Sequence, residues 1–372
     1  MNNATTLQAA LNRFLDTQEL DAHRRKVCGH LRSCRTEALG EALYRCERCE
    51  SERHFFHGCR DRHCPQCQGR ATRQWVERQR QAVLPVAYHH VVFTLPHALN
   101  GWVQLHPEVI YRLLFTSAWA TLKTFGEDPK RLGGQMGMSA VLHTWGQSLS
   151  QHVHLHCLVP AGALSDAGQW KPIKGHYLFP VKALSRHFRG HLVSALRQSA
   201  KDGEFERVTR PGELNSLLDE LMAKEWVVYT RHCLSHTESV VEYLGRYTHR
   251  IAITNARILD IDEQSVCIRY KDYRDDRHKT MRLEGEEFVR RYLLHILPEG
   301  FMRIRHYGFL ANRCRERKLA VIREALAVQA SEPGEQADSD PGMKCPVCKA
   351  GHLRLVAVLP AIMRQERMPS RR

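Results

Sequence analysis

Two overlapping His-x-His pairs lie in residues 151–160, which read QHVHLHCLVP. Side chains two residues apart on a β-strand share one face, so either pair can chelate one metal ion. His154 and His156 run directly into an apolar stretch, which places them inside a strand rather than a loop. Neutral imidazoles there would leave positions open for phosphate oxygens on Mg²⁺ or Mn²⁺. The alternative is a set of structural histidines with ordinary hydrogen bonds.

A tyrosine pair supplies a second kind of chemistry. Tyr243 and Tyr247 stand four residues apart, and on a helix such side chains lie on one face. A deprotonated tyrosine can attack a phosphodiester and remain joined to the phosphate. Because a phenol has an ordinary pKa of about 10, it needs help from a metal or a cation. Arg246 and Arg250 are the candidates for phosphate contact, whereas two core aromatic residues at helical spacing are the structural alternative.

The cysteines indicate zinc. Residues 28–67 hold seven cysteines and four histidines, and they lack the periodic apolar runs of an ordinary core. Two CxxC turns, Cys46/Cys49 and Cys64/Cys67, are separated by fourteen residues and together can form a four-thiolate zinc site. A second zinc site would draw on Cys34, Cys59 and His63 with one further ligand. We expect the module to be a zinc ribbon that also contacts DNA, the alternative being zinc with a structural role alone.

A third CxxC turn lies near the C-terminus. Cys345 and Cys348 follow a polar, acidic stretch at 328–342 that contains proline and glycine and that we interpret as a flexible linker. Two cysteines with His352 as a possible third ligand predict either a small zinc knuckle or a segment without metal. We therefore treat 343–372 as a separate basic tail that cleavage does not need.

Charge and composition limit the partner. The 372 residues carry a net charge of +15, with 43% hydrophobic and 26% charged residues, as in globular proteins with a substantial core. An excess of this size favours a polyanion, because counterion release from phosphates drives nucleic-acid affinity. The sequence contains no apolar run near twenty residues and no signal segment, so we expect no membrane contact and a cytoplasmic location with the DNA of the nucleoid. A homo-oligomer is compatible with these features.

The pattern of elements predicts an α+β fold. Strands are expected at 89–95, 138–145, 153–159, 226–230 and 250–259, followed by a hairpin with arms at 266–273 and 279–283. Helices are expected over 1–24, around 109–119, at 184–196 and 214–224, and through the tyrosine pair. Hairpins with intervening helices favour an antiparallel sheet over a βαβ repeat. The expected units are a zinc-binding domain at 1–82, a nuclease domain at 83–327, the linker and the tail.

Several motifs in a fixed order resemble those of one family. They are CRDRHCPQCQ, HHVVFTLPH, LHTWGQSL with HVHLHCLVPAGAL, YLGRYTHRIAI and FMRIRHYGFLANR. In these stretches the chain is similar, over nearly its whole length, to the two-tyrosine HUH rolling-circle transposases of the insertion-sequence ninety-one family. One departure is the stretch RHCLSHTES before the tyrosines, where the family often has proline and glycine.

The resemblance implies a mechanism. It implies a Rep- and relaxase-like HUH nuclease sheet, a metal held by His154 and His156, and Tyr243 and Tyr247 as nucleophiles on single-stranded transposon ends and target DNA. HUH sites commonly add a third protein ligand, for which His143 is favoured over Gln147 and His152, because its strand is expected to pair beside the HUH strand. Two other functions remain open: a zinc-ribbon regulator without catalysis, and a metal-dependent nuclease that uses water. A relaxase or replication initiator would share the tyrosine chemistry.

Overall fold

The computed structural model describes residues 5–69, 72–73, 76–77, 83–173, 175, 177–207, 212–234, 240, 245, 251–327 and 343–361. Its centre is a five-stranded antiparallel sheet in the order β12-β4-β5-β3-β8. The strands are β3 (Tyr88–Thr94), β4 (Gly137–Trp145), β5 (Gln151–Pro160), β8 (Val228–Leu234) and β12 (Ile304–Gly308). The mixed α+β class with antiparallel sheets is confirmed, as are the strands expected near 89–95, 138–145, 153–159 and 226–230. The edge strand β12 was not predicted.

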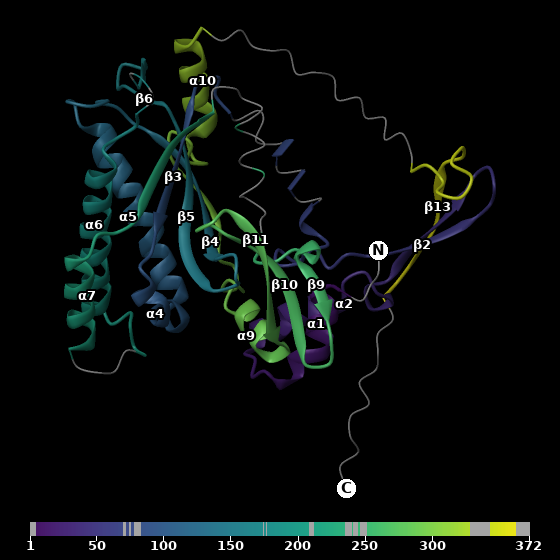
Figure 1. Ribbon diagram of the computed structural model, residues 1–372. Helices are drawn as coiled ribbons and strands as arrows, with labels where there is room; N and C mark the ends of the chain where they lie inside the picture. The colour runs from purple at the N-terminus through teal and green to yellow at the C-terminus, as the bar shows by residue number, and fades with distance from the viewer. Residues whose placement is uncertain are drawn as a thin grey trace.

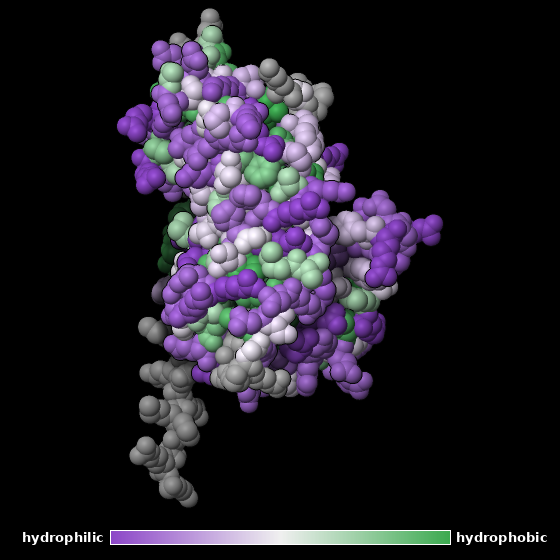
Figure 2. Space-filling view, turned by 90° about the vertical axis from the view of Figure 1, so that its left-hand side faces the viewer, coloured by the Kyte–Doolittle hydropathy of each residue, from purple (hydrophilic) through white to green (hydrophobic). Residues whose placement is uncertain are grey.

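One face of this sheet is covered by helices (Figure 1). They are α4 (Asn100–Leu105), α5 (Pro107–Glu127), α6 (Val181–Lys201) and α7 (Glu213–Ala223). Along β5 the odd-numbered residues from Val153 to Val159 are buried in the core under these helices. The even-numbered residues His154, His156 and Leu158 therefore point to the opposite face. Seen from the helical side, the surface is mostly hydrophilic, with hydrophobic residues in small separate patches (Figure 2).

A second apolar core joins the two halves of the chain. It contains α1 (Leu7–Phe14), α2 (Ala22–Ser33), α9 (Gly285–Leu293) and the three-stranded sheet of β9 (Ile258–Ile261), β10 (Ser265–Asp272) and β11 (Arg277–Glu284). Phe14 packs so closely on α9 that a Cβ at Gly285 would overlap its ring. The N-terminal segment thus shares a core with residues 252–296, across the expected domain boundary at residue 82, which stays a prediction.

The N-terminal helix was predicted as one element and is two. Thr6 caps α1 by accepting a hydrogen bond from the backbone N–H of Ala9 at 3.1 Å. Asp21 caps α2 in the same way, accepting from the N–H of Arg24 at 2.7 Å. A second N-cap inside an amphipathic stretch starts a new helix, which the apolar spacing alone did not reveal.

The strand expected at 250–259 is also shorter than predicted. The described part begins at residue 251, passes through a 3₁₀ turn at Asn255–Arg257 and becomes β9 only at Ile258. The Arg257 guanidinium donates to the carbonyl oxygens of Ala252 and Gln147, which holds the chain in this turn. The hairpin that follows is confirmed, since β10 and β11 pair from Ser265↔Glu284 to Asp272↔Arg277.

A small sheet brings the chain ends together. β1 (Glu41–Cys46) lies between β2 (Glu52–Phe56) and β13 (Leu353–Leu359), and all pairs are antiparallel. The C-terminal strand runs from Cys46↔Leu353 to Glu41↔Leu359. The interpretation of 343–372 as a separate tail is corrected for 343–361, because backbone pairing makes that stretch part of the N-terminal module. Residues 362–372 lie outside the described part.

Smaller elements complete the described chain. The ribbon β6 (Gly162–Leu164) with β7 (Trp170–Pro172) and the helix α10 (Arg315–Ala325) contribute to a further apolar cluster around Phe309. No helix within the described residues is both long enough and apolar enough to cross a bilayer.

His295 connects the end of β4 to the second core. Its Nε2 donates to the carbonyl oxygen of Leu149 at 3.1 Å, and its Nδ1 lies 3.2 Å from the hydroxyl of Thr144, which can donate to it. Burial lowers the pKa of His295 to about 4. The neutral ring is therefore the form that fits the folded protein.

We expect this histidine to make stability fall in acid. Its folded pKa lies below the unfolded value of about 6.5, so its contribution is present above pH 6.5 and is lost as pH falls toward 4. In urea unfolding, the loss between pH 7.5 and 4.5 should be smaller in His295→Gln than in the parent by roughly 2 kcal/mol. Thiolate protonation affects both proteins equally. An identical pH dependence in both would refute the assignment.

Candidate active site and metal centres

The register of two neighbouring strands assembles three histidines. β4 and β5 pair with His143 opposite His154 and Val141 opposite His156. The three rings thus meet on the sheet face away from the helices, and one nitrogen of each ring lies within 4.8 Å of one nitrogen of the others. His143 and His154 are buried, and His156 is half-buried. The structure brings together the three histidines that the sequence favoured.

Hydrogen bonds aim the rings of the two strand β5 histidines. His154 donates through Nδ1 to the carbonyl oxygen of His152 at 2.8 Å, which leaves the lone pair on Nε2. The Nδ1 of His156 lies 2.8 Å from Nε2 of His90. The Nε2 atoms of His154 and His156 are 3.1 Å apart. Two nitrogens bound to one ion at about 2.1 Å and at right angles would be about 3.0 Å apart, so the spacing fits an octahedral ion.

His143 approaches the pair from β4. Its ring stacks on Trp145 with centroids 4.6 Å apart and an interplanar angle of 19°. The centroid of His156 lies 4.5 Å away. An aromatic wall on one side thus limits where the His143 ring can turn.

The other candidate third ligands are not members of the group of three, although the ring centroid of His152 lies 4.8 Å from that of His154. Gln147 donates through Nε2 to the Tyr273 hydroxyl at 3.1 Å. His152 contributes its carbonyl oxygen to His154, while its ring faces His97 with centroids 5.5 Å apart. Neither belongs to the histidine group that can hold an ion among the described residues.

His90 is a fourth histidine beside the cluster and was not among the ligands expected from the sequence. It lies on β3 opposite Leu158, and its ring stacks on His156 with centroids 5.0 Å apart. Burial, and then the charge of Arg231, lower the pKa of His90 to about 4, so the ring is neutral at pH 7. The signal was present in HHVVFTL, because in a strand one of two adjacent histidines must face away from the core.

The tyrosine segment lies largely outside the described residues. This holds for Tyr243, Tyr247, Arg246 and Arg250. Two positions of the same stretch, Val240 and Gly245, are described and are helical and buried. Val240 belongs to an apolar cluster with Leu158, Tyr88 and Val83. Since Leu158 follows His156 by two residues on β5, this cluster lies on the face that carries the histidines.

The cysteines form two clusters, with membership that differs from the prediction. The first contains Cys34, Cys59, Cys64 and Cys67; the second contains Cys46, Cys49, Cys345 and Cys348. The expected site of Cys46, Cys49, Cys64 and Cys67 is therefore corrected. Pairing of β13 with β1 carries Cys345 and Cys348 to the first CxxC turn, and Cys34 and Cys59 complete the set around the second.

The first cluster has the dimensions of a zinc site. The Sγ–Sγ distances from Cys34 are 3.5 Å to Cys64 and 3.6 Å to Cys67, and Cys59 lies 3.9 Å from Cys67. Tetrahedral zinc with Zn–S bonds of about 2.3 Å separates its sulfurs by about 3.8 Å. A disulfide would hold two sulfurs at about 2.05 Å, so these thiols are not disulfide-bonded.

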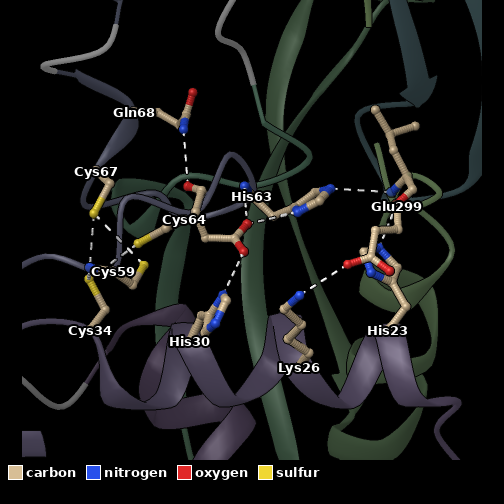
Figure 3. A network of polar contacts seen from close by, with 12 residues as sticks. His23, Lys26, His30, Cys34, Cys59, His63, Cys64, Cys67, Gln68 and Glu299 are labelled. Carbon is tan, nitrogen blue, oxygen red and sulfur yellow. Dashed lines mark hydrogen bonds and ion pairs between the residues drawn. The ribbon is translucent and has the colours of Figure 1, made fainter. Parts of the chain in front are cut away.

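His63 is not part of either cluster, contrary to expectation. Its Nδ1 donates to Asp61 at 2.9 Å, and its Nε2 accepts from the backbone N–H of Leu297 at 3.2 Å (Figure 3). Asp61 also contacts His30 at 3.1 Å. Both ring nitrogens are thus occupied, and His63 connects the cysteine cluster to the segment after α9. The neighbouring Arg62 donates to the carbonyl oxygens of Pro298 and Phe301.

Comparisons with known proteins decide the family. The model described as "Transposase zinc-binding domain" of the IS91 type matches residues 6–95. The model described as "Putative transposase" matches residues 137–318. A protein of Sinorhizobium fredii (strain NBRC 101917 / NGR234) named "Putative transposase y4qJ" is 41% identical over 92% of this chain and 91% of its own. The chain belongs to the IS91 family of transposases.

A second relative is more distant. The transposase for insertion sequence element IS801 of Pseudomonas savastanoi pv. phaseolicola is 27% identical over 81% of this chain and 73% of its own. The family resemblance inferred from the motifs is thus confirmed. As an IS91-family transposase the chain carries a zinc-binding domain, and the histidine group is consistent with an HUH site.

Zinc content should separate His63 from the cysteines. We expect His63→Gln to keep the parent zinc content per chain, because neither ring nitrogen is available to an ion. Cys34→Ser should lose one equivalent, because it removes a ligand of the first cluster. Inductively coupled plasma mass spectrometry of freshly purified protein measures both. Loss of zinc in His63→Gln would contradict this prediction and would show that His63 is a zinc ligand.

Proposed function

We propose that this transposase cuts and rejoins single-stranded DNA at transposon ends through 5′-phosphotyrosine intermediates. The observation that carries the proposal is the convergence of His143, His154 and His156 on one sheet face. The 3.1 Å between Nε2 of His154 and Nε2 of His156 fits an octahedral divalent ion, proposed to be Mg²⁺ or Mn²⁺, with positions left for phosphate oxygens. A divalent ion bound there would polarise the scissile phosphate and offset charge in the transition state.

Tyr243 and Tyr247 are the proposed nucleophiles. The support is the sequence spacing together with buried, helical Val240, whose cluster includes Leu158 on the histidine face. In the sequence, Tyr243 and Tyr247 follow Val240 by three and seven residues, and this proximity along the chain is what ties them to that face. Arg246 and Arg250 are the proposed phosphate contacts, and their cationic charge would favour the phenolate.

The chemistry balances without an external energy source. The phenolate oxygen bonds to phosphorus, the bond from phosphorus to the 3′ oxygen breaks, and that oxygen takes a proton. The phenol's proton is released, so the product is a 5′-phosphotyrosine and a free 3′ hydroxyl. Rejoining is the reverse attack by a 3′ hydroxyl, which returns the phenol. The second tyrosine can cut another strand while the first remains occupied.

Side chains on the histidine face suit an unpaired strand. Tyr229 lies opposite Val92 on β8 and is 50% exposed, so its ring can stack on a base. Arg231 lies opposite His90 on the same face and is exposed. Together with the net charge of +15, these residues favour single-stranded DNA as the substrate.

The first cysteine cluster holds the proposed structural zinc of the N-terminal module. Cys34 ends α2, and Cys59, Cys64 and Cys67 lie in the loop beyond β2. Burial of Cys34 and Cys64 in the second apolar core supports a role in folding. Among the functions left open by sequence, family membership favours the transposase over a regulator, a relaxase or a replication initiator.

Covalent trapping tests the nucleophiles. Incubation with a single-stranded end oligonucleotide and Mn²⁺, followed by denaturing electrophoresis, should show a protein–DNA adduct. We expect Tyr243→Phe or Tyr247→Phe to retain adduct formation in at least one case, and the double variant to form none. Tyr273→Phe, which removes an exposed phenol on the β10–β11 hairpin, is the matched control. A 5′ adduct in the double variant would exclude these tyrosines.

Metal affinity tests the histidines, with cleavage as a second readout. His154→Ala and His156→Ala should abolish Mn²⁺ binding at this face in calorimetric titration and abolish cleavage, while zinc content stays unchanged. His90→Ala should weaken Mn²⁺ affinity roughly 10- to 100-fold, because it removes the partner that orients His156. His90→Gln should recover part of that loss.

His306→Gln is the control for the metal titration. His306 lies on the same face but bonds to Ser139 at 2.8 Å. Parent Mn²⁺ affinity in His154→Ala, or equal losses in the His90 and His306 variants, would contradict the assignment.

A further inference from the structure

We infer that the two ends of the chain share one zinc ion, bound by Cys46 and Cys49 near the N-terminus and Cys345 and Cys348 near the C-terminus. The zinc-binding family model ends at residue 95 and the transposase model at residue 318, so neither reaches the second pair. The four thiol sulfurs nevertheless lie within 4.8 Å of one another. The proposal concerns the fold and is independent of the tyrosine chemistry.

The sulfur geometry fits zinc. Sγ of Cys46 lies 3.7 Å from Sγ of Cys348, and Sγ of Cys49 lies 3.7 Å from Sγ of Cys345. These distances match the roughly 3.8 Å between sulfurs of a tetrahedral four-thiolate zinc site. They are far from the 2.05 Å or so of a disulfide.

The two CxxC turns have the same backbone conformation. In each, the residue after the second cysteine has a positive φ, 57° at both Glu50 and Lys349. In each, that residue's N–H donates to the carbonyl oxygen of the first cysteine, at 3.0 Å and 2.9 Å. The two turns share one conformation and face each other, so each presents two thiolates to the same position. A zinc ribbon binds its ion in this way.

Backbone N–H groups also point at the sulfurs. The N–H of Arg48 lies 3.4 Å from Sγ of Cys46, and that of Gly351 lies 3.3 Å from Sγ of Cys348. Such donors stabilise thiolates and therefore support metal binding. At Gly351 a Cβ would stand 2.7 Å from Sγ of Cys46, so the close approach of the two turns requires glycine there.

Apart from its backbone pairing with β1 and the ion pair of Arg354 with Glu47, the C-terminal stretch has few stabilising contacts. Its buried side chains are Cys345 and Leu353, in a cluster whose third buried member is Cys46. Around them Leu355, Val356 and Val358 on β13 are 54%, 48% and 61% exposed. A sheet with so small an apolar core does not bury enough surface to offset its conformational entropy. Binding of the ion must therefore supply the folding free energy of this ribbon.

Zinc stoichiometry in the full-length protein tests the shared site. Cys345→Ser/Cys348→Ser should lose one zinc per chain, and Cys46→Ser/Cys49→Ser should lose the same one. Because both pairs bind a single ion, the quadruple variant should lose no more than either double variant. The double variant Cys267→Ser/Cys314→Ser, which removes two thiols outside both clusters, is the matched control and should keep the parent content.

Amide hydrogen exchange distinguishes local loss of the ribbon from misfolding of the rest of the protein. Removing Cys345 and Cys348 should speed amide exchange in β1, at 41–46, while β5 stays as protected as in the parent. Unchanged zinc in Cys345→Ser/Cys348→Ser would overturn the proposal. So would a further zinc loss in the quadruple variant, which would mean two separate sites, or a disulfide between the pairs in mass spectrometry without reductant.

Discussion

The pairing register of β4 and β5 is the constraint on which the site depends. It sets His143 opposite His154 and gives the odd-numbered residues of β5 to the helix-covered core. A slip of one residue would turn His154 and His156 into that core and bring Leu155 and Cys157 to the open face. Burying the apolar set under α5 and α6 therefore also fixes where the histidines point. The alternation of apolar residues and histidines along β5 therefore determines both the packing of the core and the geometry of the metal ligands.

Hydrogen bonds set the ring orientations of the histidines that the strand register brings together. The carbonyl oxygen of His152 fixes the tautomer of His154, and His90 on β3 orients the ring of His156. The central strand thus has a neighbour on each side that acts on the cluster, with His143 from β4 and His90 from β3. Preorganisation of this kind lets an ion bind without reordering the rings, which keeps the cost in conformational entropy low.

Elements set by local or periodic contacts could be predicted from the sequence. Short β-rich and apolar runs located β3, β4 and β5 within a residue or two. The expectation that strand 138–145 lies beside the HUH strand brought His143 into the site. Contacts between residues that are distant along the chain could not be predicted from the sequence. Cys46/Cys49 and Cys64/Cys67 were joined because they are neighbours in sequence, but strand pairing between β1 and β13 decides the matter.

Other errors have the same origin. His63 has zinc-like spacing from Cys59, yet a backbone N–H at Leu297 and the Asp61 carboxylate occupy its nitrogens. Nothing in the sequence indicated that α1 and α2 bury their apolar faces against α9 and the hairpin, across the expected boundary near residue 82. In each case at least one of the contacts joins residues more than two hundred positions apart in the sequence. The spacing of residues along the chain carries no information about such contacts.

The most direct test of the account is the position of Mn²⁺ in a crystal soaked with the ion. Anomalous diffraction at the manganese edge should give a peak about 2.2 Å from Nε2 of both His154 and His156, with His143 as the third protein ligand. The same crystal should show zinc at the cysteine clusters and none at the histidines. A manganese peak away from these three rings, with the histidines hydrogen-bonded only to one another, would contradict the central claim.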